Sequence, residues 1–356
     1  MNNKLLFVSG TFDDNGGRPS HLADKICAKL SEKFNVSAAN GGFYESLEKI
    51  IRVVPEYKYV LWWPNVPNDK GKIRDVKSYN KECILVTSKR NDGWKYTFKE
   101  LVNRALGQKA NLCVEFRKQD DVYSLTLFDP LGNVWYSGCS VEDFCNVLAE
   151  RMEFLAVITR QGTVNVPESI EVPDKKEFFD IVKCYADTFH SLIMPEEGVT
   201  RFLGNSSFRC TKGGFPSFRS DGGIIFVSKR NIDKRFIDKD GFVPCMLDEN
   251  GSIIVYGETK PSVDTPIQLR LYNALPNINY MIHSHVYISG AEFTDRMIPC
   301  GGLEEVGEIL SKITDRNKSF YALNLVGHGS IVMSEYTDKL KNIQYVSRSI
   351  PEILTE

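Results

Sequence analysis

The 356-residue sequence has no surplus of charge, no long apolar run and no pair of cysteines at C-x-x-C spacing. Its 44 Lys and Arg balance 46 Asp and Glu, so we expect neither nucleic acid nor a membrane surface as a partner. No apolar run approaches the roughly 18 residues that a membrane span needs. These absences leave a folded globular protein, and 42% hydrophobic residues are enough to build buried cores.

The nine cysteines are odd in number and scattered along the chain. This pattern is untypical of a disulfide framework or of a zinc site made of thiolates, and it favours a reducing compartment. The apolar run before Ser9 and Gly10 has only four residues, too few for the core of a signal peptide. We therefore expect a cytoplasmic protein.

At about 100–200 residues per domain, the chain should form two domains, residues 1–165 and 166–356. The first alternates short apolar runs with helical patterns, which predicts a Rossmann-like α/β domain with a mostly parallel sheet. Its strands are expected at 5–8, 36–39, 59–63 and 83–87, and its helices at about 21–33, 44–54 and 97–106. An antiparallel meander from residue 112 onward and a helix from about 141 to 160 should complete it.

The stretch from Gly162 to Lys176 carries two prolines and breaks the periodicity, so it is predicted to be the linker. Beyond it, apolar residues recur at helical spacing from Phe178 to Phe189. Short strands then dominate, which predicts an α+β domain with a mostly antiparallel sheet. These strands are expected at 223–228, 253–256, 280–285, 320–326 and 330–334, with helices at about 265–275 and 302–314.

Three of the five histidines fall in two short segments of this second domain. His283 and His285 are two residues apart, so on an extended strand both imidazoles point to the same face. His328 lies between two glycines, which would let the backbone approach closely at a turn. Three imidazoles with an open fourth position suit catalytic zinc or a similar ion. The alternative is that they are ordinary sheet and turn residues.

Asp264 precedes a predicted helix and allows two interpretations. Ser262, Asp264 or Thr265 could simply be the N-cap, with Pro266 in the first turn. Alternatively, Asp264 serves as an acid or base near the metal, and the free N–H groups of the helix start bind an anion.

Together these residues resemble the class II aldolase/adducin family, which includes L-fuculose-phosphate aldolase and L-ribulose-5-phosphate 4-epimerase. Five blocks occur in the family's order across about residues 175–350. They are Gly204 to Arg209 (G-N-x-S-x-R), Ser228 to Asp233 (T-P-S-G-V-D), Lys260 to Pro266 (K-P-S-S-[ED]-T-P), His283 to His285 (H-x-H) and Asn324 to Gly329 (N-H-G). The resemblance implies an α/β/α class II aldolase-like domain.

It also implies the site. The family's metal ligands fall on His283, His285 and His328, with Zn²⁺ the usual ion and Mn²⁺ or Co²⁺ as alternatives, and Asp264 takes the place of the residue that moves protons. Asn205, Ser228 and Ser262 fall where the family binds a phosphate or the equivalent end of a substrate.

The implied activity is that of a lyase or epimerase of carbohydrate metabolism. Its substrate would be a sugar-derived hydroxy-carbonyl compound, possibly phosphorylated, converted through a metal-stabilised enediolate. Active sites of the family lie between subunits, so a homo-oligomer, often a tetramer, is implied as well. The fold alone does not select cleavage, epimerisation or decarboxylation.

Several positions depart from the family pattern. Lys229 and Arg230 replace small residues of the anion-binding turn and could supply charged donors instead, or could be solvated turn charges. Val263 replaces a serine. Asn324 is separated from His328, so its support of the histidine is lost or moved. The tyrosine that a neighbouring subunit contributes is not assignable, although Tyr336 and Tyr345 are available.

The first domain matches no family that we identify. A loop rich in glycine, residues 9–20, joins its first strand to its first helix, and Arg18 adds a positive charge. This loop could receive a phosphate, or it could be a flexible loop capped by Ser20. Trp62 and Trp63 end a predicted strand, where ligands often bind in open α/β sheets, although two tryptophans are more often core or interface residues. The domain could bind a nucleotide or a sugar, or it could serve in assembly. Two further hypotheses for the protein are a nucleotide-dependent transferase centred on this domain and a non-catalytic, adducin-like scaffold that uses the second domain.

Overall fold

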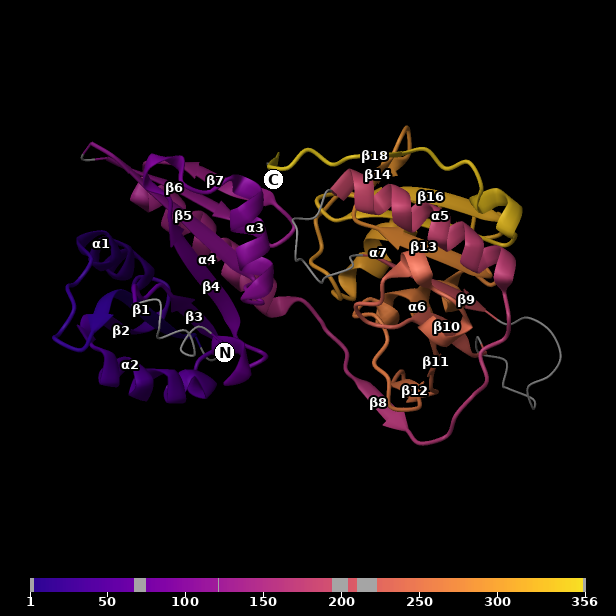
Figure 1. Ribbon diagram of the computed structural model, residues 1–356, viewed down its shortest axis with the longest axis horizontal. Helices are drawn as coiled ribbons and strands as arrows, with labels where there is room; N and C mark the ends of the chain where they lie inside the picture. The colour runs from indigo at the N-terminus through magenta and orange to yellow at the C-terminus, as the bar shows by residue number, and fades with distance from the viewer. Residues whose placement is uncertain (1–2, 67–74, 121, 194–203, 210–222, 355–356) are drawn as a thin grey trace. The chain divides into compact units, whose positions relative to one another are not determined.

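The computed structural model describes residues 3–66, 75–120, 122–193, 204–209 and 223–354. The chain forms two compact units, Met1–Val157 with Ser349–Glu356, and Ile158–Arg348 (Figure 1). The division predicted at about residue 165 falls inside β8 (Thr163–Val166), which pairs with β12 (Ile253–Tyr256) of the second unit. The structure therefore divides the chain earlier, because the presumed linker contributes a strand.

The first unit is built on an eight-stranded sheet in the order β2-β1-β3-β4-β5-β6-β7-β19. All pairs from β2 to β5 are parallel, and β5, β6 and β7 form an antiparallel meander. This confirms a mostly parallel α/β domain. The strands are β1 (Lys4–Asp13), β2 (Asn35–Phe43), β3 (Tyr59–Trp62), β4 (Ile84–Arg90), β5 (Leu112–Gln119), β6 (Val122–Phe128), β7 (Asn133–Gly138) and β19 (Glu352–Ile353).

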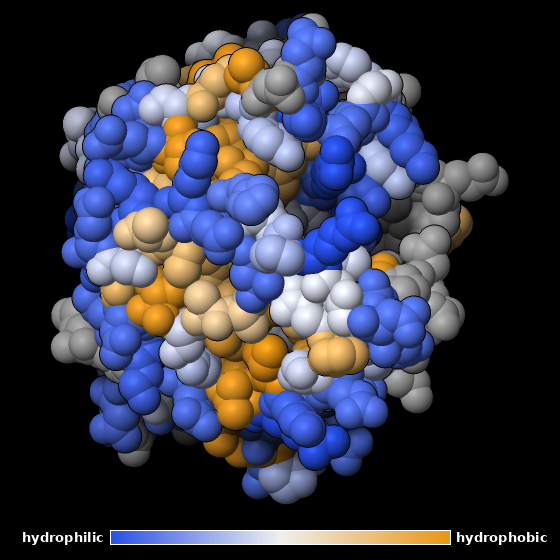
Figure 2. All heavy atoms as spheres, turned by 90° about the vertical axis from the view of Figure 1, so that its left-hand side faces the viewer, coloured by the Kyte–Doolittle hydropathy of each residue, from blue (hydrophilic) through white to orange (hydrophobic). Residues whose placement is uncertain are grey.

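Helices cover both faces of this sheet because its strands bury both sets of alternating side chains. In β1, Leu5 and Phe7 pack toward α1 (His21–Leu30) and α4 (Val141–Val157). Leu6 and Val8 face the opposite way, toward α2 (Tyr44–Ile50). The remaining helix, α3 (Phe98–Gly107), begins with a capping box of Thr97 and Glu100. Figure 2 shows hydrophilic side chains over much of one face of the molecule, with apolar side chains gathered between them.

The second unit contains a nine-stranded sheet in the order β15-β16-β17-β13-β9-β10-β11-β12-β8. Its inner pairs are antiparallel, and its two end pairs, β15 with β16 and β12 with β8, are parallel. The further strands are β9 (Asn205–Arg209), β10 (Ile225–Ser228), β11 (Phe242–Leu247), β13 (Tyr280–Ser284), β15 (Glu292–Phe293), β16 (Phe320–Leu325) and β17 (Gly329–Ser334). A separate two-stranded ladder joins β14 (Tyr287–Ile288) to β18 (Tyr345–Val346).

Alternation along β13 sets the direction of the site. Ile282 packs with α5 (Lys176–Ile193) on one face of the sheet, while Met281 packs with α6 (Thr265–Ala274) and α7 (Glu304–Ser311) on the other. His283 follows two residues after Met281 and therefore points toward the face of α6 and α7. Helix, sheet and helix form three layers in this unit.

Short 3₁₀ helices complete the described chain: η1 (Ile51–Glu56), η3 (Val76–Ser78), η4 (Asp92–Trp94), η5 (Lys234–Phe236), η6 (Lys239–Gly241) and η7 (Thr337–Leu340). Among the described residues, no helix has the length and apolarity that a membrane crossing requires.

Candidate metal centre

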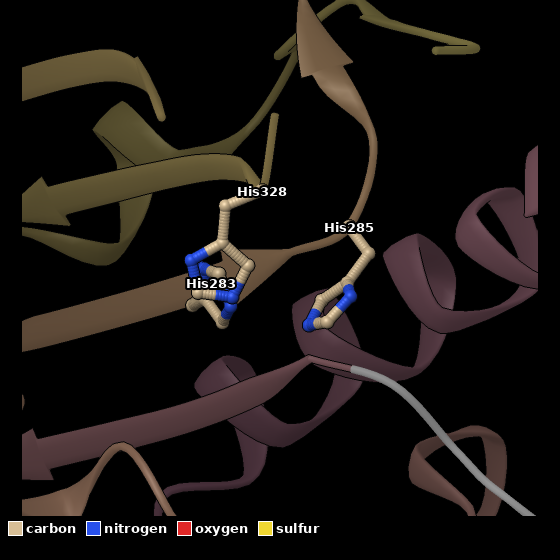
Figure 3. A group of neighbouring side chains, drawn as sticks. All are labelled: His283, His285 and His328. Carbon is tan, nitrogen blue, oxygen red and sulfur yellow. The ribbon is translucent and has the colours of Figure 1, made fainter. Parts of the chain in front are cut away.

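The three histidines of the predicted site come together in the second unit (Figure 3). His283 lies near the end of β13, His285 follows that strand, and His328 occupies the turn between β16 and β17. Their candidate ligand atoms lie within 4.8 Å of one another, and all three side chains are buried. Residues far apart in sequence thus form one cluster of imidazoles.

Glycine makes this approach possible. A Cβ atom on Gly329, whose φ is +154°, would lie only 1.9 Å from the carbonyl oxygen of Ser284. Gly327 takes a positive φ of +67°, and its N–H donates to the hydroxyl of Tyr287 over 3.0 Å. The turn can therefore bring His328 against the end of β13 only with glycine on both sides.

Two ring nitrogens in the cluster are left for a ligand. Nδ1 of His283 donates to the carbonyl oxygen of Ser330 over 2.9 Å, which leaves Nε2 as the atom with a lone pair. That Nε2 and Nδ1 of His285 are buried without a hydrogen-bond partner among the described residues. Buried polar atoms are almost always paired, so this pair of nitrogens fits a divalent ion.

The charge states of His283 and His285 also suit the binding of a divalent ion. Burial, followed by the positive charge of His328, lowers the pKa of His283 to about 4. Burial and the neighbouring histidines also hold the pKa of His285 well below its usual value. Both imidazoles are therefore neutral near pH 7, which is the form that donates a lone pair to a metal.

His328 differs because both of its ring nitrogens are engaged. Nδ1 lies 2.6 Å from Oε1 of Glu305, a residue of α7, and Nε2 lies 3.2 Å from Sγ of Cys300. Burial works to lower the pKa of His328, but the charges of Cys300 and Glu305 outweigh it and raise this pKa well above its usual value. With Glu305 on Nδ1, Nε2 is the nitrogen that can face a metal.

Asp264 occupies the N-cap position of α6, but its side chain does not cap the helix. It is 6% exposed, and its side chain makes no capping hydrogen bond to α6. Instead, its Oδ2 accepts from Nδ2 of Asn205 over 2.8 Å and its Oδ1 from the N–H of Gly301 over 3.0 Å. The predicted N-cap position of Asp264 is therefore confirmed, whereas its carboxylate accepts hydrogen bonds from Asn205 and Gly301 and none from the helix.

The predicted substrate-binding residues Asn205, Ser228 and Ser262 surround this carboxylate. The side-chain oxygen of Asn205 accepts from Gln268, so its amide is engaged at both ends. Oγ of Ser228 accepts from the N–H of Ser206, and Oγ of Ser262 accepts from the N–H of Asp264 over 3.4 Å. In this structure the three residues organise the backbone and carboxylate around Asp264.

The structure does not bring Lys229 to the histidines. Lys229 lines a cavity of about 400 Å³ whose described lining includes none of the three. Nε of Arg230 donates to the carbonyl oxygen of Pro261 over 3.3 Å. Asn231 takes a positive φ of +59°, the conformation for which the family's turn uses glycine.

Two functional candidates escaped the sequence reasoning. Lys234 in η5 is 7% exposed, and burial lowers its pKa to about 8 although Asp233 and Asp264 act in the opposite direction. Its charge also contributes to the low pKa values of His283 and His285. In sequence, Lys234 sits in the charged run of residues 233–235, which is typical of a solvated turn, so no local signal marks it.

Glu305 is the second such residue, and its position explains a departure from the family pattern. The amide of Asn324 contacts the backbone of Ile288 and Ala291 instead of the histidine. Glu305 supports His328 in its place, although in sequence it looks like an ordinary acidic residue in the first turn of a helix. Of the two tyrosines considered, Tyr345 is buried in the core with α5, and Tyr336 is 56% exposed.

The first unit has a cavity of about 710 Å³ at the ends of its parallel strands. It lies where the strand order reverses between β1 and β3, the place at which open α/β sheets bind ligands. The predicted glycine loop forms part of the wall, but several of its backbone N–H groups already donate to the protein, as when Thr11 N–H donates to the Arg18 carbonyl and Gly17 N–H to the Gly42 carbonyl. Cationic side chains of the lining are Arg18, Lys89, Arg90, Arg104 and Lys118.

A comparison with known protein families finds a match within the second unit. Residues 186–338 match the family described as Class II Aldolase and Adducin N-terminal domain. The matched residues lie within the second unit, which is thus similar to this family. The resemblance expected for about residues 175–350 is thereby confirmed, and the family supports an aldolase, epimerase or decarboxylase type of activity in general. No curated protein matches the chain.

Three solved structures are similar to parts of the chain. The DNA/pantothenate metabolism flavoprotein from Streptococcus pneumoniae is 12% identical with a TM-score of 0.34, covering 42% of this chain and 98% of its own. The C-terminal domain of the coenzyme A biosynthesis bifunctional protein CoaBC is 12% identical with a TM-score of 0.33, covering 43% and 95%. YgbL from Klebsiella pneumoniae, named for a proposed aldolase, epimerase or decarboxylase activity, is 13% identical with a TM-score of 0.28, covering 46% and 83%.

Proposed function

We propose that the second unit is a divalent-metal-dependent aldolase or epimerase that acts on a sugar-derived hydroxy-carbonyl compound. The observation that carries this proposal is the pair of unpartnered, buried nitrogens on His283 and His285, gathered with His328. A scaffold that never bound metal would keep both nitrogens unpaired, at a cost of about 1–3 kcal/mol each. The metal-dependent reading is therefore favoured over an adducin-like scaffold.

The histidines would hold the ion, and Asp264 would move the proton. A divalent ion bound there supplies Lewis acidity toward a carbonyl and an adjacent hydroxyl oxygen. Each carboxylate oxygen of Asp264 accepts one hydrogen bond from the protein and keeps a second lone pair. Asn205 and Gly301 thus fix the orientation of the carboxylate while leaving it able to take a proton from the substrate.

Lys234 indicates the charge of the substrate. Its buried ammonium interacts with Asp264 and with the imidazoles of His283 and His285. A fixed positive charge in a desolvated site stabilises negative charge far more than it would in water. We infer that the substrate presents a carboxylate, a phosphate or a developing oxyanion to Lys234.

Zinc titration of the metal-stripped full chain tests this function. We expect one site per chain in the native protein, no site in His283→Ala, and an unchanged site in the control His190→Ala, which alters an exposed histidine of α5. The loaded native protein is then screened for cleavage and epimerisation of hydroxy-carbonyl sugars and sugar phosphates. A native chain that binds neither zinc, manganese nor cobalt would refute the proposal.

A second candidate function concerns the cavity of the first unit. We propose that it binds a small anionic molecule such as a nucleotide, because cations line a hollow at the reversal of strand order. In addition, the buried indole N–H of Trp62, which also lines the cavity, has no hydrogen-bond partner in the described ranges. Calorimetric titration of the full chain with nucleotides and nucleotide sugars tests it, with His283→Ala as the control that should still bind.

A further inference from the structure

We propose that Cys300 is a fourth protein ligand of the metal, so that three imidazoles and one thiolate hold the ion before substrate enters. This inference rests on the proposed function, because it requires an ion at the histidines. It concerns a residue that the five family blocks do not contain. When the ion binds, Sγ loses its proton to solvent and forms a bond to the metal.

Distance is the first argument. Sγ of Cys300 lies 3.2 Å from Nε2 of His328, which is the metal-facing nitrogen because Glu305 engages Nδ1. In a tetrahedral zinc site, bonds of about 2.3 Å to sulfur and 2.0–2.1 Å to nitrogen place the two ligand atoms about 3.6 Å apart. The thiol and this imidazole are thus close to the separation of two ligands of one ion. Sγ lies outside the group formed by the ligand atoms of the three histidines, so Cys300 must move toward the ion as it binds.

The loop that carries Cys300 is held in place by the site itself. The next residue, Gly301, has a positive φ of +76° and donates its N–H to Oδ1 of Asp264. The N–H of Gly302 closes a turn on the carbonyl oxygen of Pro299 over 2.9 Å. Cys300 is thereby fixed between the carboxylate of Asp264 and the ring of His328.

Three other cysteines of the described chain show what an inert, buried thiol looks like here. Cys113, Cys145 and Cys245 are buried in the apolar clusters of the two units, and burial raises the pKa of each thiol to about 12. Cys300 is only partly buried and contacts a histidine. Apolar packing therefore does not account for its position.

A thiolate ligand has two consequences for the enzyme. Cys300 would hold the ion together with the three histidines, and four protein ligands would leave less room for substrate at the ion than three. A soft sulfur ligand also selects zinc or cobalt over manganese and magnesium.

Cobalt spectroscopy of the full-length protein tests the proposal without measuring activity. Bands in the visible region report Co²⁺ in a tetrahedral site whatever its ligands, whereas a sulfur-to-cobalt charge-transfer band in the near ultraviolet requires a thiolate. We expect both in the native protein. Cys300→Ser should keep the visible bands and lose the near-ultraviolet band, and the control Cys184→Ser, at an exposed cysteine, should keep both.

Metal affinity supplies a second measurement. We expect Cys300→Ser to bind zinc about tenfold or more weakly, with manganese affinity unchanged. Native protein with visible cobalt bands but no near-ultraviolet band would overturn the role of Cys300 and leave the proposed function standing. Native protein that binds no cobalt at all would overturn both.

Discussion

The candidate sites of the two units are built in opposite ways. At the histidine cluster, buried polar groups hold one another, as Asn205 holds Asp264 and Glu305 holds His328. At the strand-end cavity of the first unit, the side chain of Arg18 is exposed. Within the glycine loop, the N–H of Thr11 donates a hydrogen bond to the carbonyl oxygen of Arg18. At the histidine cluster, burying the polar groups costs free energy of desolvation but holds the reacting group in one orientation. At the cavity of the first unit, the charged side chains stay solvated, which suits reversible binding of an anion.

The largest effect is expected when the histidine cluster loses Asp264, the residue proposed to move the proton. Asp264→Asn should still bind zinc at one site but lower kcat by about 10²- to 10⁴-fold, because the amide cannot accept the proton. Steady-state kinetics with the substrate found in the screen provide the measurement. The exposed Asp187→Asn in α5 is the control, and an active Asp264→Asn would show that another group moves the proton.

The support of His328 should have the next largest effect. Glu305→Gln keeps a side chain of similar size but removes the negative charge that orients and polarises the imidazole. We expect zinc affinity to fall about 10- to 100-fold. Competition titration with a chelator measures this, and an unchanged affinity would mean that Glu305 only fills space.

In the metal-free protein, the free energy of unfolding should depend on pH through the histidines of the second unit. His283 has a folded pKa of about 4, below the unfolded value, so its contribution to the free energy of unfolding is present above pH ~6.5 and is lost as pH falls toward 4. His328, whose pKa is raised, contributes in the opposite sense and loses its part as pH rises.

Replacing His283 by Ala in metal-free protein should therefore make the loss of stability between pH 6.5 and 4 shallower. Urea unfolding at a series of pH values provides the slope for each protein, and exposed His190→Ala serves as the control. A slope identical to that of the native chain would contradict the neutral, buried state of His283.

The smallest effect is expected at the rim of the first unit. Arg18→Ala removes one exposed charge, so affinity for a bound nucleotide should fall only about two- to fivefold. Zinc binding should not change. Lys25→Ala, at an exposed position of α1, is the control. Complete loss of nucleotide binding in Arg18→Ala would instead mean that binding in this cavity depends on a single contact, the one made by Arg18.

The sequence predicted the gathering of the three histidines better than the residues around them. The spacing of His283 and His285 fixes a common face of a strand, and the glycines around His328 report a close backbone approach, so local patterns sufficed. Lys234, Cys300 and Glu305 reach the site only through long-range packing. Their neighbours in sequence carry no trace of it, as the charged run around Lys234 illustrates.

In the fold, too, elements marked by local sequence patterns were predicted, and elements that depend on distant segments were not. Long apolar runs and helical periodicity located the parallel strands and main helices of the first unit. The missed elements include β8, which lies in the predicted linker, the short strands β14, β15 and β18, and β11, which contains Pro244 and lacks alternation. β19, whose pairing with β7 returns the chain end to the first unit, was missed as well. Pairing between distant segments depends on tertiary contacts that no local pattern encodes.

Metal content of the untagged native chain, measured by elemental mass spectrometry, tests the central claim most directly. We predict about one zinc or cobalt per chain after loading, and loss of this metal in both His283→Ala and His328→Ala. Native protein that stays free of metal and refuses added zinc, cobalt and manganese would contradict the account.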